Sequence, residues 1–245
     1  MLVQYVSDLH LEFGGLRRVR AEMQRRAPVL VLAGDVGHPF EDHYGEFMDF
    51  TGAMFDKVFL VAGNHEFYDT NHFMGETTRR LHDLARGAGV SFLDNSCETY
   101  RGRRFAGSTL WSRISDLQAL TNDFRLIRNL SVEAYNGLHE DCVAYLGALP
   151  PEPGTVVVTH YLPSERLVAE RYRRAPHSRF NQCYASDCDH LLAGKAAWFH
   201  GHTHVKSATR LNGVDVLCNP LGYPGENDTA TLNEVFALQE PGPSE

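Results

Sequence analysis

Short apolar runs alternate with amphipathic segments along the first third of the chain. The apolar runs are LVQYV (2–6), VLVLAG (29–34) and VFLVAG (58–63). Segments whose apolar residues have helical spacing lie between and after them, at 16–28, 41–54 and 73–87. Pro28 is expected to stop the first of these helices. This alternation predicts parallel strands that are covered by helices.

The pattern changes in the rest of the chain. Residues 97–111 predict a hairpin that turns near Arg101-Gly102, and residues 208–220 predict a second hairpin around Asn212-Gly213. Helices are expected over 115–127 and 131–149, and further strands over 155–160, 196–199 and 234–239.

Together these elements predict one α/β domain over residues 1–238, built as a two-sheet α/β/β/α sandwich. A helical and hairpin segment at about 97–150 would be inserted in its middle. Residues 239–245 would form a disordered tail.

Polar residues that can bind metal follow five of the apolar runs. They are Asp8 and His10, Asp35, Asn64 and His65, His160, and finally His202 and His204. In open α/β sheets, ligands bind outside the carboxyl ends of the strands, so we expect these side chains to meet in one crevice.

The donor set indicates which metals the crevice would hold. Carboxylate, amide and imidazole donors without a thiolate suit Mn, Fe, Zn, Co or Ni better than calcium or a structural zinc. Asp8, His10, Asp35, Asn64, His160, His202 and His204 are too many ligands for one tetrahedral ion. They suit two divalent ions that share a carboxylate and keep a small net positive charge, for which a phosphate ester is the natural guest.

These motifs resemble those of the calcineurin-like metallophosphoesterases. The matching elements, in the order of that family, are Asp8-Leu9-His10, Gly34-Asp35, Gly63-Asn64-His65-Glu66, His160 and Gly201-His202-Thr203-His204. Five elements in order, each at a strand end, are far more specific than any one of them. The resemblance covers residues 8–204 and implies both the two-sheet sandwich fold and a metal-dependent hydrolase.

The resemblance also implies a role for each matching residue. Asp8, His10 and His204 would hold the first ion, Asn64, His160 and His202 would hold the second, and Asp35 would bridge the two. His65 would contact the phosphate and assist the leaving group, which makes His65 and Asp35 the expected catalytic residues. Members of this family use a metal-bound hydroxide as the nucleophile and form no covalent intermediate.

Three features bear on the subfamily. The protein phosphatases of this superfamily carry Asp-Arg-Gly after the Gly-Asp motif, whereas here Val36-Gly37-His38 follows Asp35, which argues against a protein phosphatase. The nuclease and cyclic-nucleotide branches more often have Asp at the position of Glu66. The motif Cys218-Asn219-Pro220-Leu221-Gly222-Tyr223 is similar to one in uncharacterised bacterial members.

Composition narrows the setting. The formal net charge of −8 makes duplex nucleic acid an unexpected partner. The chain has no apolar run long enough to span a membrane and begins without a basic leader, so we expect a cytoplasmic protein. The five cysteines include no C-x-x-C pair and are expected to be reduced.

Several residues outside the motifs are candidates for substrate contact. The segment 166–182 carries Arg166, Arg171, Arg173, Arg174 and Arg179 and could meet a second phosphate or the leaving group, or could be an ordinary solvated basic face. His38, His200 and the group Asn122, Asp123 and Arg125 could likewise contact the site or the substrate, or could be ordinary residues of a loop or sheet edge.

The sequence therefore favours a dinuclear metal-dependent hydrolase of a small phosphoester, preferably a phosphodiester or nucleotide-type substrate. The alternatives are a phosphomonoesterase that acts on nucleotides or proteins, a nuclease, and a non-catalytic scaffold on the same fold.

Overall fold

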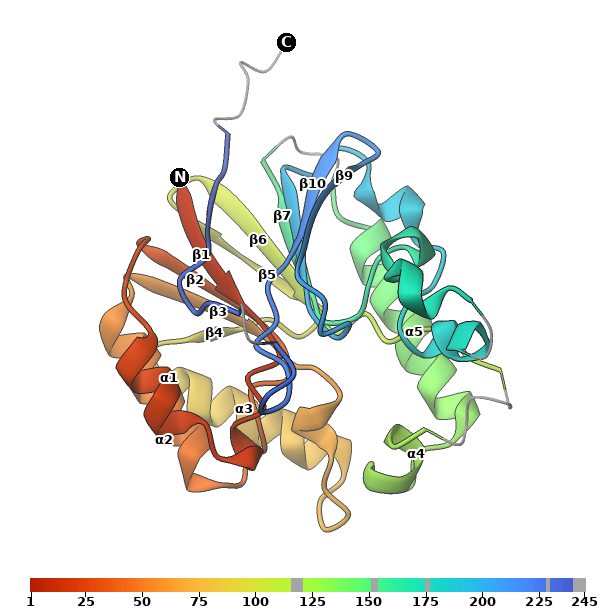
Figure 1. Ribbon diagram of the computed structural model, residues 1–245, viewed down its shortest axis with the longest axis horizontal. Helices are drawn as coiled ribbons and strands as arrows, with labels where there is room; N and C mark the ends of the chain where they lie inside the picture. Colours follow the sequence, from red (N-terminus) through yellow and green to blue (C-terminus); the bar gives the residue numbers. More distant parts are fainter. Residues whose placement is uncertain (116–120, 151–153, 175–176, 228–229, 240–245) are drawn as a thin grey trace.

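Two β-sheets lie against each other in the centre of the structure (Figure 1). The computed structural model describes residues 1–115, 121–150, 154–174, 177–227 and 230–239. The first sheet has the strand order β11-β1-β2-β3-β4, and the second has the order β5-β6-β7-β8-β10-β9. The strands are β1 (Leu2–Val6), β2 (Val29–Ala33), β3 (Lys57–Val61), β4 (Ser91–Phe92), β5 (Ser96–Tyr100), β6 (Arg103–Ser108), β7 (Val156–Thr159), β8 (Ala197–His200), β9 (Ser207–Leu211), β10 (Val214–Cys218) and β11 (Val235–Ala237).

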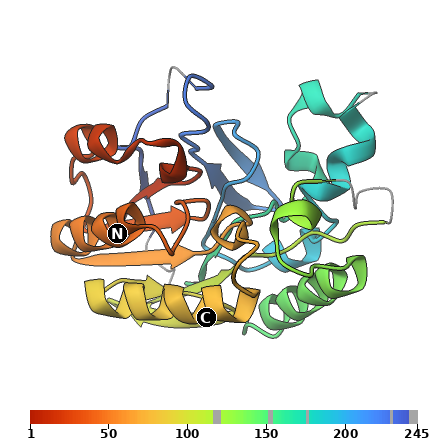
Figure 2. The same cartoon turned by 90° about the horizontal axis from the view of Figure 1, so that it is seen from below.

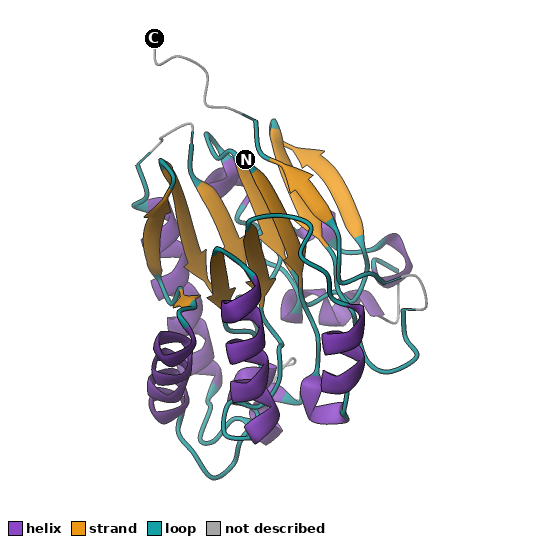
Figure 3. Ribbon diagram, turned by 90° about the vertical axis from the view of Figure 1, so that its left-hand side faces the viewer, coloured by secondary structure: helices purple, strands orange, loops and turns teal. Residues whose placement is uncertain are grey.

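The helices cover the outer faces of the two sheets. Figure 2 shows α1, α2 and α3 on the side of the first sheet and α5 on the side of the second, and Figure 3 shows most of the helices toward one end of the strands. The α-helices are α1 (Leu16–Glu22), α2 (Asp42–Met54), α3 (Met74–Ala88), α4 (Asp123–Leu126) and α5 (Val132–Gly147). The 3-10 helices are η1 (Leu11–Phe13), η2 (His65–Phe67), η4 (Glu165–Leu167), η5 (Glu170–Tyr172), η6 (His177–Cys183) and η7 (Asp189–Leu192).

The core between the sheets follows from the two-residue period of the strands. In β2, Val29 and Val31 pack into the layer between the sheets, while Leu30 packs with the helical layer outside. The rings of Phe59 and Phe105 stack across the two sheets with centroids 4.2 Å apart. Both faces of each central strand are buried, which explains the uninterrupted apolar runs of the sequence.

The structure confirms the predicted two-sheet sandwich and both hairpins. The first hairpin turns at Arg101 and Gly102, whose φ angles are 49° and 76°, and the second turns at Asn212 and Gly213, with φ of 51° and 80°. Glycine occupies the second position of both turns and asparagine the first position of the second turn, and these residues tolerate the left-handed region best, which made the turns recognisable from the sequence.

The first helix is shorter than predicted: α1 ends at Glu22, well before Pro28. Met23 is extended, and side chains from distant strands and loops capture the next backbone N–H groups. The N–H of Gln24 donates to Asn233 Oδ1 at 2.7 Å, and that of Arg26 donates to Gln4 Oε1 at 2.8 Å. These tertiary hydrogen bonds replace the helical ones, so proline is not what ends the helix.

The segment at 97–150 supplies β6 and α5 and nearly all of β5, so it forms one edge of the second sheet and part of its cover. Of the helix predicted over 115–127, residues 116–120 lie outside the described residues, and α4 occupies Asp123–Leu126. Residues 240–245 of the predicted tail also lie outside them.

Five parallel strands direct their carboxyl ends to one edge of the sandwich. β1, β2 and β3 are parallel neighbours in the first sheet, and β7 and β8 are parallel neighbours in the second. Backbone hydrogen bonds join the loops that follow them: Asp8 N donates to Gly34 O at 2.9 Å, and Gly201 N donates to His160 O at 3.0 Å. The polar residues after these strands are thereby brought together.

Candidate active site

The seven predicted metal ligands meet where the five strand ends converge. Asp8, His10, Asp35 and His204 each offer one ligand atom, and these atoms all lie within 4.8 Å of one another. Asp35, His160 and His202 form a second group that meets the same limit. Asp35 belongs to both groups, so its carboxylate lies between two sets of donors.

Distances in the first group are those of donors that could share one ion. The Nε2 atoms of His10 and His204 are 3.0 Å apart, and His204 Nε2 lies 3.3 Å from Asp8 Oδ1. His10 Nε2 is 3.8 Å from Asp35 Oδ2. Imidazole nitrogens bind zinc at about 2.0–2.1 Å, so two donors on one ion lie roughly 3–3.5 Å apart.

The second group includes Asn64 as well. His160 Nε2 lies 3.3 Å from Asp35 Oδ2, 3.1 Å from Asn64 Oδ1 and 3.2 Å from His202 Nδ1. Asn64 Nδ2 donates to Asp123 Oδ1 at 3.0 Å, which turns the amide oxygen of Asn64 toward His160. The amide therefore presents the atom that a cation would bind.

The outward ring nitrogens of the four histidine ligands are held by acceptors. His10 Nδ1 lies 3.1 Å from Glu12 Oε1, His204 Nδ1 lies 2.6 Å from Glu226 Oε2, and His160 Nδ1 lies 2.9 Å from the carbonyl oxygen of Ala33. For His202 the arrangement is reversed, because its Nε2 lies 3.1 Å from the carbonyl oxygen of Cys183. An acceptor at one nitrogen leaves the other unprotonated in the neutral ring, as metal binding requires. The donor set and its supports fit divalent cations.

Five of the ligand residues have left-handed backbones. The φ angles are 53° for Asp8, 46° for His10, 54° for Asp35, 71° for His202 and 49° for His204. Non-glycine residues rarely adopt this region, and such strain concentrates at functional sites. These left-handed residues lie in the turns that follow β1, β2 and β8.

Three glycines leave room for the ligands. A Cβ on Gly63 would collide with the Asp35 carboxylate and lie 2.7 Å from His160 Nε2, and one on Gly201 would lie 2.8 Å from Asp8 Oδ2. A Cβ on Gly34 would lie 2.5 Å from His160 Nδ1. The glycines of the motifs are therefore required by close approach of the ligands.

Glu66 connects the loops after β2 and β3 through hydrogen bonds to their backbone. Its buried carboxylate accepts hydrogen bonds from the backbone N–H groups of Asp35, Val36 and Gly63 at 3.0, 2.7 and 2.7 Å. Burial and the charge of Asp35 raise the pKa of Glu66 to about 7, against the effect of these donors. Glu66 thus sets the position of the bridging candidate Asp35.

His65 lies beside the two ligand groups that share Asp35, and with His10 and Glu12 it forms a third cluster whose ligand atoms all lie within 4.8 Å of one another. Its backbone N–H donates to Asp35 Oδ1 at 2.9 Å, its Nδ1 lies 2.8 Å from Glu12 Oε1, and its Nε2 lies 3.2 Å from the hydroxyl of Tyr223. Burial lowers the pKa of His65, but the charge of Asp35 and the hydrogen bond to Glu12 outweigh it and raise the pKa. A protonated imidazole at the rim can donate a proton.

A cavity of about 250 Å³ opens over the ligands. Its lining includes Asp35, Asn64, His65, Asn122, Asp123, Tyr172, Tyr184, His202 and His204. Neither lysine nor arginine occurs in the lining among the residues that the structure describes. Any phosphate there would depend on metal ions and on the imidazole of His65 for charge compensation.

Three functional neighbours were missed from the sequence. Glu12 lies only two residues after His10, so its place in the same turn was a usable signal. Tyr223 and Glu226 approach His65 and His204 from a loop far along the chain; the motif that ends at Tyr223 marked this loop but gave no sign of these contacts. That loop follows Cys218-Asn219-Pro220, where Asn219 Nδ2 donates to the carbonyl oxygen of Tyr5 at 2.9 Å and ties it to β1.

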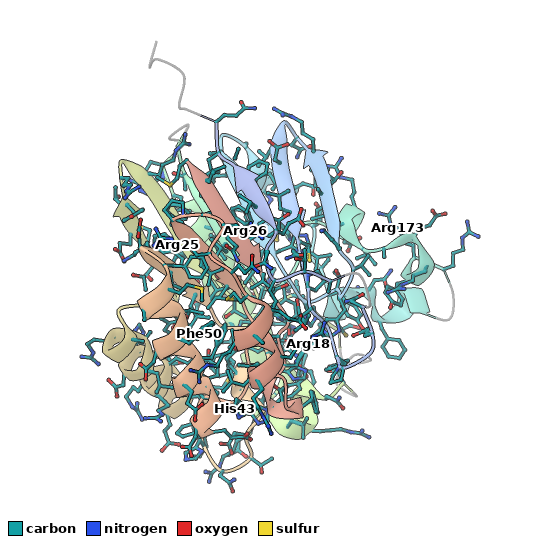
Figure 4. The ribbon with its side chains drawn as sticks, turned by 60° about the vertical axis from the view of Figure 1, so that its left-hand side comes forward. Arg18, Arg25, Arg26, His43, Phe50 and Arg173 are labelled. Carbon is teal, nitrogen blue, oxygen red and sulfur yellow. The ribbon has the colours of Figure 1, made fainter. Side chains whose placement is uncertain are left out.

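Among the described residues of the arginine segment, Tyr172 lines the cavity and no arginine does. Arg166 pairs with Asp189 at 2.6 Å, and Arg173 Nε donates to the carbonyl oxygen of Val168 at 2.7 Å. Figure 4 shows Arg173 on an outlying part of the molecule. Arg171 lies over the ring of Tyr172, and Arg174 pairs with Glu170. The side chain of Arg179 is outside the described part of the chain.

Of the other residues considered for substrate contact, some line the cavity and some do not. Asn122 and Asp123 line the cavity, while Arg125 does not. His38 lies beside a neighbouring cleft and pairs with Glu41 at 3.3 Å. His200 is buried, its Nδ1 lies 3.1 Å from the carbonyl oxygen of Gly201, and burial lowers its pKa to about 4. It belongs to neither ligand group.

The model of the calcineurin-like phosphoesterases matches residues 1–206, most of the chain. This chain belongs to the calcineurin-like phosphoesterase family. An uncharacterised protein of Acanthamoeba polyphaga mimivirus is 26% identical over 93% of both chains. The crystal structure of the phosphopantetheinyl hydrolase from Mycobacterium tuberculosis superposes with a TM-score of 0.76, covering 92% of this chain and 90% of that one at 20% identity. That likeness shows the fold.

Family membership makes this phosphoesterase a metal-dependent hydrolase, and the two ligand groups are residues that could bind its metal. Among the described residues, no helix of the phosphoesterase is long and apolar enough to cross a membrane. Its five cysteines are free thiols.

Proposed function

We propose that this phosphoesterase uses two divalent metal ions to hydrolyse a small phosphodiester or nucleotide-type substrate. The observation that carries the proposal is the position of Asp35, whose carboxylate belongs to both ligand groups. A carboxylate shared by two sets of donors is the arrangement that a dinuclear site needs.

The ligands divide between the two sites. Asp8, His10 and His204 would hold one ion, Asn64, His160 and His202 the other, and Asp35 both. Divalent ions of the kind that this donor set suits (Mn, Fe, Zn, Co or Ni) supply charge neutralisation and a water molecule of lowered pKa.

His65 would protonate the leaving oxygen. Glu12 holds the Nδ1 side of the ring, so Nε2 is the atom that faces the substrate, beside the hydroxyl of Tyr223. Proton donation at this point stabilises the charge that develops on the departing oxygen.

The charge of the cavity favours a diester over a monoester. A phosphodiester carries one negative charge at neutral pH and a phosphomonoester carries nearly two. The described lining has no lysine or arginine to offset the second charge. The Asp-Arg-Gly motif that follows Gly-Asp in the protein phosphatases of this superfamily is also missing, since Val36-Gly37-His38 follows Asp35. The fold shared with a phosphopantetheinyl hydrolase is consistent with a small phosphoester.

The test is turnover of bis-p-nitrophenyl phosphate and p-nitrophenyl phosphate by protein stripped of metal and reloaded separately with Mn, Zn, Fe, Co and Ni. We expect metal-dependent turnover with a higher kcat/KM for the diester. A higher kcat/KM for the monoester would make the protein a phosphomonoesterase, and no turnover with any metal would overturn the proposal.

A further inference from the structure

A second and more apolar cleft opens beside the candidate active site. Its volume is about 710 Å³, and it shares His65, Tyr68, Asn122 and Tyr223 with the cavity over the ligands. The two spaces meet at His65, whose Nε2 faces the Tyr223 hydroxyl at 3.2 Å. A substrate with its phosphate over the ligands and its leaving oxygen near His65 would extend its leaving group into this cleft.

The walls of the cleft gather exposed apolar side chains. Phe13, Leu126 and Tyr223 line it and are 55%, 39% and 40% exposed. They are three of the seven exposed large hydrophobic residues found within the described ranges. Exposed apolar groups that cluster in a concavity mark a binding site, whereas singly scattered ones are ordinary.

Phe13 is held in this position by the same turn that carries a metal-ligand candidate. Its backbone N–H donates to the carbonyl oxygen of His10 at 3.0 Å, and Gly14 with φ of 85° ends the turn. The rings of Phe13 and Tyr223 meet edge to face with centroids 5.5 Å apart. The apolar wall is therefore fixed relative to the ligands and not a loose surface feature.

The charge of the cleft excludes a second phosphate. Its ionisable lining includes Glu12, His38, Glu41 and His65, and neither lysine nor arginine occurs in the part of the lining that the structure describes. His38 pairs with Glu41 at 3.3 Å, and Glu12 lies against His10 and His65. A group with a further negative charge would meet these carboxylates, and the only cations that the described lining could offer are histidines already paired with Glu41 and Glu12.

We propose that the cleft lined by Phe13, Leu126 and Tyr223 binds an uncharged, mainly apolar leaving group of a substrate with a single phosphate. This inference rests on the proposed hydrolase function and narrows its substrate class. Esters of apolar alcohols would be favoured, and nucleoside diphosphates and triphosphates would be poor substrates.

The test separates binding from turnover. Calorimetry would measure the Kd of methylphosphonate, octylphosphonate and octane-1,8-bisphosphonate on the metal-loaded protein, below micelle-forming concentrations. Each buried methylene strengthens binding roughly three- to fourfold, so we expect octylphosphonate to bind at least about tenfold more tightly than methylphosphonate. Octane-1,8-bisphosphonate should bind no more tightly than methylphosphonate, because its second phosphonate group would lie in the apolar cleft.

Two variants test whether the cleft is the source of the tighter binding of octylphosphonate. The double variant Phe13→Ala/Leu126→Ala should bind both alkylphosphonates alike, whereas Phe73→Ala should behave as the wild type. Phe73 is 45% exposed and lines neither space. Equal binding of methyl and octyl probes by the wild type, no binding of the octyl probe, or an undiminished gain in the double variant would overturn the inference.

Turnover of methyl, butyl and octyl phosphodiesters then distinguishes the two proposals, since these alcohols have similar pKa values. Tight octyl binding without turnover of any ester would support the cleft and overturn the hydrolase function. Turnover that ignores chain length, with equal binding of the probes, would leave the hydrolase function standing and overturn the cleft.

Discussion

Oε1 of Glu12 lies 2.8 Å from Nδ1 of His65. The same oxygen lies 3.1 Å from Nδ1 of His10, so one carboxylate supports both a metal-ligand candidate and the proposed proton donor. Burial would raise the pKa of Glu12, but the hydrogen bonds from His10 and His65 outweigh it and lower the pKa to about 2. Glu12 is therefore ionised at neutral pH and orients two imidazoles at once.

Replacing Glu12 by glutamine should lower kcat about 10- to 100-fold, because a neutral amide supports both imidazoles less well. The decrease should be measured at saturating metal, so that weakened metal binding through His10 does not contribute. Glu41→Gln is the matched control, since Glu41 lines the adjoining cleft but contacts His38 and His43 instead. Equal kcat for the two variants would show that Glu12 has no role in positioning.

His65→Ala should retain the metal content of the wild type and lose turnover by roughly 10²–10⁴. The loss should be larger for alkyl esters than for p-nitrophenyl esters, since a poor leaving group needs the proton more. Rates on a series of esters with different leaving-group pKa values, combined with metal analysis, check this. A loss of the same size for every ester would argue against proton donation by His65.

Asp35→Asn should reduce bound metal below two ions per chain and lower turnover at least about 100-fold, because the shared carboxylate loses its charge. Elemental analysis of the loaded proteins and steady-state kinetics provide the measurement. Asp69→Asn, which affects a carboxylate paired with His72 at 2.6 Å, is the control and should leave both quantities unchanged. Full metal content and rate in Asp35→Asn would contradict the dinuclear proposal.

Metal affinity should rise with pH up to about pH 9. In the metal-free protein burial lowers the pKa of His160 and His204, but the charge of Asp35 for His160 and the hydrogen bond to Asp8 for His204 raise each to about 9. Metal binding needs neutral imidazoles, so protons must leave at lower pH, and each one released weakens binding roughly tenfold per pH unit.

Calorimetric titration with Mn²⁺ at pH 6, 7 and 8, in buffers of different ionisation enthalpy, would count those protons. Weaker binding and greater proton release at pH 6 are expected. An affinity that is constant between pH 6 and pH 8 would mean that both imidazoles are already neutral in the metal-free protein.

Gly63→Ala should destabilise the fold by about 1–3 kcal/mol and impair metal binding, because the added methyl group would displace Asp35 and His160. Gly87→Ala is the control: Gly87 lies in α3 with open space around it, and alanine there should stabilise by about 0.5–1 kcal/mol. Urea unfolding and metal stoichiometry of both variants check this. Similar effects of the two substitutions would show that the space around the ligands is not restricted.

The sequence was sufficient for the parts of the molecule that depend on neighbouring residues. The ligand candidates lie shortly after the ends of apolar runs, so Asp8, Asp35 and His160 could be placed at strand ends, and parallel strands leave those ends at one edge. Both hairpins could be placed because residues such as Asn212 and Gly213 tolerate left-handed backbones.

Tertiary structure alone decided which distant side chains support those ligands. Glu226 contacts His204 and Tyr223 contacts His65. Asn233 accepts the hydrogen bond of the Gln24 N–H group, which a longer α1 would have used within the helix. The arginines of 166–174 contact acidic side chains, a tyrosine ring and backbone carbonyl groups near them in the chain or in space. In this region Tyr172 and Tyr184 line the cavity instead. Local periodicity specifies where a strand ends, but a contact between residues far apart in the chain depends on how all the intervening elements pack.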